Sequence, residues 1–115
     1  MRAFSNVSPK ADLRAHARES VHRQAKVLEG PFAVDAIITD ISPGGLRLAL
    51  GSRAPNAETL IIVDLGPGVA YEGRVVWRRG AECGLRILKS QDLRGRVAGQ
   101  FDAARRLWLA AQRRG

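Results

Sequence analysis

Two short stretches of the chain contain residues whose types and spacing suit the binding of an anionic ligand. Asp40, Ser42 and Gly45 lie within one turn, DISPGG, and Arg14 and Arg18 lie four positions apart further upstream. An arginine fork binds phosphates and guanine edges bidentately, and a carboxylate accepts hydrogen bonds from N–H groups. The two stretches could therefore form one site, provided that the fold brings them together.

Each stretch alone has a simpler interpretation. In the turn, aspartate and serine bond their own backbone two residues on, proline fixes φ, and the glycines admit positive φ. An arginine pair is common in a chain with sixteen arginines. The combination is more informative, because antiparallel neighbouring strands would place the turn and the start of the first strand at the same end. Arg14 and Arg18 would then lie over the turn.

The turn belongs to a series of predicted strands. Residues 1–13 show no hydrophobic periodicity, which predicts a flexible N-terminal arm. After them, apolar stretches, most of them alternating with polar residues, are separated by turns that contain glycine or proline. This pattern predicts a mostly β fold, a six-stranded antiparallel barrel. The expected strands are 20–28, 33–41, 46–50, 58–65, 69–78 and 83–87. The barrel unit, with the arginine pair included, is expected to span residues 14–90.

The pattern changes after Ser90, which we take as a helix N-cap. Apolar residues then recur at a spacing of three and four, which predicts a C-terminal helix over residues 91–114 that packs against the barrel. Such a stripe more often forms core than a cofactor site. The stripe consists of Leu93, Val97, Phe101, Ala104, Trp108 and Ala111.

The composition limits the classes of function. The 115 residues suffice for one domain, and a net charge of +8 makes an anionic partner the class to expect. A single cysteine, Cys83, excludes an internal disulfide, and we read it as a small buried hydrophobe. We expect no metal and no cofactor, because His16 and His22 make a poor metal site and one cysteine builds no metal cluster.

Neither catalysis nor membrane insertion is expected. The chain has no paired carboxylates, no nucleophile beside a base and no phosphate-binding loop, so we assign no catalytic residue. No apolar run approaches the roughly 20 residues that span a bilayer, and the N-terminus lacks a secretory signal. A cytoplasmic protein is the resulting expectation.

Taken in order, these features resemble a PilZ domain. The resemblance consists of RxxxR at Arg14 to Arg18 before the first strand and DxSxxG at residues 40–45 between the second and third strands. A six-stranded barrel with a C-terminal helix is also similar to that family, as are EGRVVW (72–77) and GLRI (84–87) in the later hairpin. The similarity covers roughly residues 12–112.

The resemblance implies a bacterial receptor for cyclic di-GMP, which carries two phosphates and two guanines. Arg14 and Arg18 would grip a guanine edge, stack on a base or pair with a phosphate. Asp40 would accept from the guanine N–H groups, Ser42 would donate to a phosphate or to water, and Gly45 would allow close approach of a base. Ligand would then order the N-terminal arm and change contacts with a downstream protein partner.

Two alternatives stay open. The same barrel could serve as a protein-interaction module that binds no nucleotide. A basic barrel could also bind RNA or DNA, but that function needs exposed aromatic side chains. Tyr71 and Trp77 share the apolar face of their strand with Val69 and Val75, so we expect both to be buried. A nucleic acid polymer is therefore not the expected partner.

Overall fold

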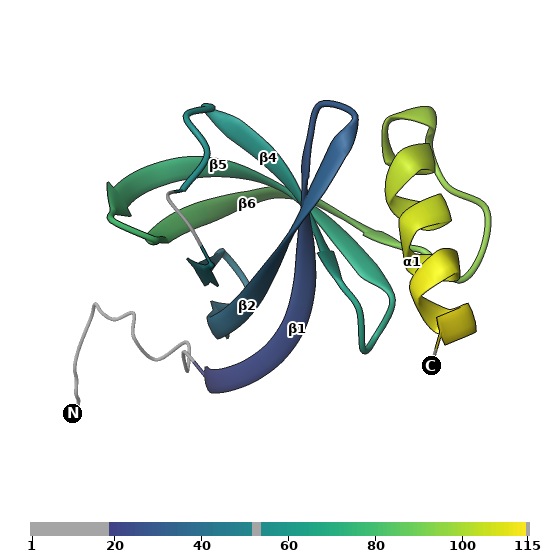
Figure 1. Cartoon of the computed structure of the whole chain (residues 1–115), viewed down its shortest axis with the longest axis horizontal. Helices are drawn as coiled ribbons and strands as arrows, with labels where there is room; N and C mark the ends of the chain where they lie inside the picture. Colours follow the sequence, from purple (N-terminus) through teal and green to yellow (C-terminus); the bar gives the residue numbers. More distant parts are fainter. Residues whose placement is uncertain (1–18, 52–53, 115) are drawn as a thin grey trace, which may run out of the picture.

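Six antiparallel strands close into a barrel in the computed structural model, which describes residues 19–51 and 54–114 (Figure 1). The order around the barrel is β1-β2-β3-β6-β5-β4, and pairing of β4 with β1 closes it. The predicted fold, a six-stranded antiparallel barrel with a C-terminal helix, is confirmed. The strands are β1 (Glu19–Glu29), β2 (Phe32–Ser42), β3 (Gly45–Leu50), β4 (Thr59–Asp64), β5 (Val69–Arg79) and β6 (Glu82–Asp92).

Alternating residues of every strand fill the barrel. The central side chains have no exposed surface, and each fully buried aliphatic one contributes about 1.5–3 kcal/mol relative to exposure. The expectation that Cys83 is buried is confirmed, and burial raises the pKa of its thiol. The fully buried set includes Val27, Ile38, Leu48, Ile62 and Cys83.

The C-terminal helix begins later than the periodicity predicted. The strand β6 continues to Asp92, which pairs with Val69, so Ser90 lies in a strand and is not an N-cap. A short 3-10 turn, Gly99–Phe101, leads into α1 (Asp102–Arg114).

The chain directly after β6 is held in a non-helical conformation. One carboxylate oxygen of Asp92 accepts hydrogen bonds from the backbone N–H of Arg94, at 2.9 Å, and from its Nε, at 3.0 Å. These bonds and the neighbouring charge lower the pKa of Asp92 to about 2. Two glycines, Gly95 and Gly99, each disfavour a helix by roughly 1 kcal/mol relative to alanine. The predicted first part of the helix, residues 91–101, was therefore wrong.

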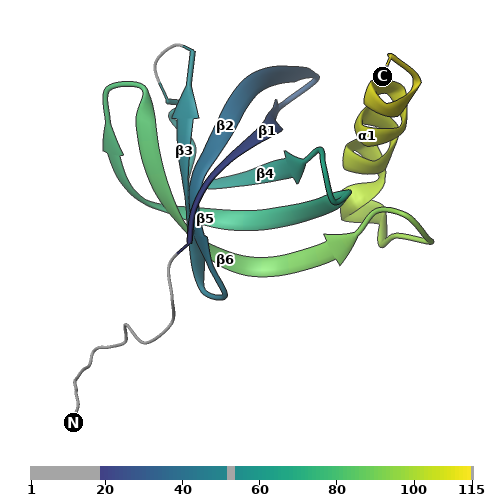
Figure 2. The same cartoon turned by 90° about the horizontal axis from the view of Figure 1, so that it is seen from below.

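Helix α1 packs beside the β4–β5 turn (Figures 1 and 2). Phe101 and Ala104 are buried in a second apolar cluster, which confirms the predicted core role of the stripe. The indole Nε1 of Trp108 donates to the carbonyl of Leu65 at 3.0 Å. A Cβ at Gly68 would lie 2.7 Å from the Trp108 ring, so the glycine allows the indole to sit on the turn. Neither described helix is long and apolar enough to cross a membrane.

One acidic side chain, at the end of β4 next to the β4–β5 turn, is buried in the barrel wall. Asp64 has no exposed surface, and its Oδ2 pairs with Arg23 Nη1 at 2.8 Å. Its other oxygen, Oδ1, has no hydrogen-bond partner among the described residues. Burial raises the pKa of the Asp64 carboxyl, and the Arg23 charge only partly opposes this.

Candidate functional site

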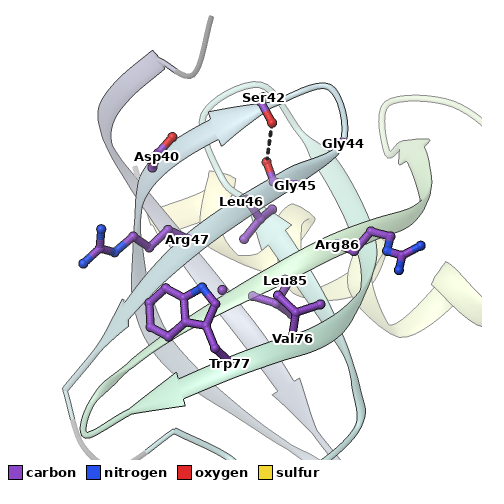
Figure 3. A pocket seen from close by; sticks show the side chains of 11 residues that line it. Asp40, Ser42, Gly44, Gly45, Leu46, Arg47, Val76, Trp77, Leu85 and Arg86 are labelled. Atoms are coloured by element: carbon purple, nitrogen blue, oxygen red, sulfur yellow. Dashed lines mark hydrogen bonds between the residues drawn. The ribbon is translucent and has the colours of Figure 1, made fainter. Parts of the chain in front are cut away.

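The turn between β2 and β3 is a tight hairpin connection. In the register of β2 and β3, Asp40 lies opposite Arg47 and Ser42 lies opposite Gly45. The Ser42 hydroxyl also donates to the Gly45 carbonyl at 3.4 Å (Figure 3). The backbone N–H of Ile87 donates to the carbonyl of Gly44 at 2.9 Å, which ties the turn to β6. The turn is therefore a fixed part of the barrel rim.

The glycines of this turn have a different role from the predicted one. Positive φ occurs at Gly30, Gly68 and Gly80, so the expected positive φ at residues 44 and 45 was wrong. A Cβ at Gly45 would lie 2.8 Å from the carbonyl oxygen of Leu85. Glycine is required there because β6 passes so close.

The first strand starts beside the same turn. Glu19 pairs with Ile41, and Ser20 pairs with Asp40. This register confirms the predicted juxtaposition of the turn and the start of β1. Arg14 and Arg18 lie outside the described residues, although Arg18 directly precedes Glu19 in the chain.

An open pocket of about 480 Å³ lies on the outer face of the barrel next to the turn (Figure 3). Three of the predicted site residues, Asp40, Ser42 and Gly45, line it. Strands β3, β5 and β6 provide the remaining wall. The further lining residues are Gly44, Leu46, Arg47, Val76, Trp77, Gly84, Leu85 and Arg86.

Trp77 lies on the outer face, which corrects the expectation that it is buried. The pairing of β5 with β6 shifts register between Val75 and Trp77, and this bulge reverses the alternation. The Trp77 side chain is 38 % exposed. A Cβ at Gly84 would lie 2.1 Å from the indole Nε1, so the ring rests directly on the glycine backbone. Trp77 therefore offers an exposed aromatic ring of the kind that nucleic-acid binding requires.

Arg47 links the indole to the Asp40 turn. Its guanidinium carbon lies 5.4 Å from the centre of the Trp77 ring, and its Nη2 donates to Glu82 at 2.8 Å. That hydrogen bond and the Arg47 charge lower the pKa of Glu82. Arg79 lies 6.0 Å from the same ring centre. The result is an aromatic surface held in place by cations.

Arg47 and Trp77 were not among the residues predicted from the sequence to form the site. One available signal was Gly84, because a strand glycine opposite an aromatic residue leaves room for the ring. The bulge that turns Trp77 outward has no comparable signal in the sequence.

A second hollow, of about 400 Å³, lies on the other side of the turn. Ser42 borders both hollows, and Glu19 lies at the rim of the second. Tyr71 lines it and is partly buried, and this burial raises the pKa of the Tyr71 hydroxyl. The start of β1 thus borders this second hollow beside the turn.

The groups around the larger pocket suit recognition of a ligand. They comprise a carboxylate, a hydroxyl, accessible backbone and an indole with an adjacent guanidinium. Within residues 19–51 and 54–114, no three His, Cys, Asp or Glu side chains lie close enough together to hold a metal ion. The chemistry available is hydrogen bonding, charge pairing and stacking.

The barrel and its outer pocket define a small β-barrel binding domain. Residues 12–98 match the PilZ domain family, and the chain belongs to that family. PilZ domains are receptor domains, and the family as a whole is associated with cyclic di-GMP. None of the curated proteins compared with the chain matches its sequence.

Proposed function

We propose that this protein binds cyclic di-GMP at the pocket beside the Asp40 turn. The observation that carries the proposal is the pairing of Ser20 with Asp40, which puts the start of β1 next to the turn. Arg18 is one peptide bond away from that start. The DxSxxG turn lines the pocket, and in the sequence the RxxxR motif ends at the residue that precedes the neighbouring strand.

Each ligand group has a partner of suitable chemistry. Arg14 and Arg18 bind a phosphate or the O6/N7 edge of guanine, and Asp40 accepts from the guanine N1–H and N2–H groups. The Ser42 hydroxyl exchanges its long bond to the Gly45 carbonyl, at 3.4 Å, for one to a phosphate or to a bridging water. Gly45 leaves the backbone open to close approach of the base.

Trp77 adds a stacking surface that the motifs do not include. Its ring rests on the backbone of Gly84, and the guanidinium carbon of Arg47 lies 5.4 Å from the ring centre. Stacking of a base on an aromatic ring is worth about 1–3 kcal/mol. We assign Trp77 to contact with one guanine, on the side of the pocket opposite the turn.

Binding is expected to transmit a signal through the segment before β1. A ligand that contacts Arg14 and Arg18 as well as Asp40 connects that segment to the barrel. This connection alters the surface offered to a downstream protein.

Isothermal titration of cyclic di-GMP into the purified protein tests the proposal. We expect binding to the wild type and at least about a tenfold loss in Arg18→Ala and in Asp40→Ala, because each removes a charged partner of the ligand. Arg113→Ala, an exposed arginine on α1, serves as the matched control and should bind normally. Absence of binding to a folded wild type would refute the proposal.

A nucleic acid polymer is the second candidate function. It is favoured by one observation, the exposed Trp77 with Arg47 and Arg79 within 6.0 Å of its ring centre. Proteins that bind single strands use several aromatic residues along a basic groove, and their affinity depends strongly on salt. Titration of a single-stranded oligonucleotide at two salt concentrations separates the candidates.

A further inference from the structure

Two bulges expose aliphatic side chains on the outer face of the β5–β6 hairpin. Val76 is the extra residue of β5 between the pairs Val75–Leu85 and Trp77–Gly84. Leu88 is the extra residue of β6 between the pairs formed by Glu72 and Gly73. Val76 is 56 % exposed and Leu88 is 41 % exposed, so each bulge turns an aliphatic side chain toward solvent.

Two arginines face each other between these bulges. The register of β5 and β6 pairs Arg74 with Arg86, and both are exposed. Figure 3 shows the Arg86 side chain pointing away from the Trp77 ring. No carboxylate among the described residues pairs with either guanidinium. The acidic side chain next along the strand, Glu72, instead accepts from Gln100 at 3.1 Å.

This arrangement does not stabilise the barrel. Like charges directly opposite each other on neighbouring strands are destabilising, and exposed aliphatic side chains gain nothing from the fold. Both features concentrate on one hairpin face in the described part of the chain. They match the anatomy of a binding surface, in which apolar anchors lie beside arginines.

Charge decides the class of occupant. A second copy of a chain with a net charge of +8 would bring further positive charge to two arginines that already face each other. Aliphatic anchors favour a protein over a nucleic acid, whose bases stack on aromatic rings. We propose that the outer face of the β5–β6 hairpin docks an acidic protein segment that carries apolar side chains.

The inference goes beyond nucleotide binding and does not require it. The docking residues are Arg74, Val76, Arg86 and Leu88, and two of them, Val76 and Arg86, also line the pocket. A molecule in the pocket therefore borders the docking surface. The two binding events are tested with different ligands, so failure of one leaves the other intact.

A display library of short random peptides, selected against the full chain, provides the probe. We expect enrichment of peptides that combine Asp or Glu with Leu, Ile or Phe. The tightest peptide should lose about tenfold or more in affinity for Arg74→Glu/Arg86→Glu and for Val76→Ser/Leu88→Ser, as for contacts at the centre of an interface. A charge-reversed peptide should prefer the double-glutamate variant.

Arg113→Glu provides the control, because it removes an exposed arginine on α1 with the same change of net charge per site. It should leave peptide affinity unchanged. Equal loss in Arg113→Glu would show attraction by net charge alone and would overturn the proposal. Peptides that bind the double variants as well as the wild type, or a selection that enriches no acidic–apolar sequence, would overturn it too. So would an oligonucleotide that occupies this face in place of the peptides.

Discussion

Gly84 is the residue on which the aromatic side of the pocket depends. Its Cα supports the Trp77 indole, and the space that a Cβ would need is already occupied by the ring, at 2.1 Å from Nε1. Substitution forces the indole to leave its position. The pocket wall would then lose both the flat ring and its contact with Arg47.

Gly84→Ala should therefore destabilise the protein by about 1–3 kcal/mol, the usual cost of forcing extra volume into a packed position. We also expect weaker cyclic di-GMP binding and a shift in tryptophan fluorescence. Gly95→Ala is the control, because nothing lies within 4 Å of its Cβ position. Urea unfolding monitored by circular dichroism measures the difference; equal stability of both variants would contradict the close contact.

Asp64 is the second residue with a testable environment. Its folded pKa is raised by burial, so it binds a proton more tightly in the folded state than in the unfolded state. The stability it contributes is therefore present below the unfolded pKa of about 3.9 and is lost as the pH rises through the folded pKa.

The free energy of unfolding of the wild type, compared with Asp64→Asn, should fall as the pH rises from acidic to neutral. Asparagine keeps the shape without the titration, so the difference between the two proteins isolates this carboxyl. Urea unfolding at a series of pH values measures it. A difference that is constant across the series, or that grows with pH, would contradict the raised pKa.

At the scale of elements, the strands could be predicted and their irregularities could not. Alternating apolar residues, and a continuous apolar run at residues 60–63, placed all six strands between their turns. The bulges at Val76 and Leu88 follow from how β5 curves against β6, and a single strand's sequence does not show that curvature. This is why Trp77 was expected inside and lies outside.

The start of the helix was missed for a related reason. Leu93 and Val97 fit the helical spacing of Phe101 and Ala104, yet they belong to a connecting segment. Leu93 reaches the apolar cluster under α1 without being helical. Tertiary packing produced a pattern that resembles local helical periodicity.

The β5–β6 hairpin gives a prediction at this scale. Arg74→Glu should stabilise the fold by about 0.2–1 kcal/mol, because it replaces a like-charge pair with an opposite-charge pair across the strands. Thermal unfolding at low salt measures the effect. The matched change Arg113→Glu has no cross-strand partner and should give no comparable gain.

Loss of stability in Arg74→Glu, with Arg113→Glu unchanged, would mean that the arginine already contributes to the fold. The interpretation of the pair as a binding feature would then lose its basis.

At the scale of the whole molecule, barrel closure joins segments that are distant in sequence. Asp40, Ser42 and Gly45 were predicted from their motif, and the register confirms that Asp40 lies opposite Ser20 at the start of β1. Arg47, Trp77 and Gly84 come from three different strands. Their meeting depends on the pairing of β3 with β6, which no local pattern reveals.

Ligand should protect the segment before β1. We expect trypsin to cleave after Arg14 and Arg18 several-fold more slowly at saturating cyclic di-GMP, because both side chains then bind the ligand. Cleavage after Arg113 serves as the internal control and should not change. Mass spectrometry of timed digests gives both rates; identical rates at Arg14 and Arg18 with and without ligand would refute the signalling step.

The most direct test of the pocket uses the two tryptophans of the chain, Trp77 and Trp108. Their indole N–H groups give two separate signals in a nitrogen–proton correlation spectrum. Trp77 lines the pocket, whereas Trp108 is bonded to Leu65 beside α1. Titration with cyclic di-GMP should move the Trp77 signal together with the amides of Asp40 and Gly45, and leave Trp108 in place. A Trp77 signal that stays fixed at saturating nucleotide, or a shift confined to Trp108, would contradict binding at this pocket.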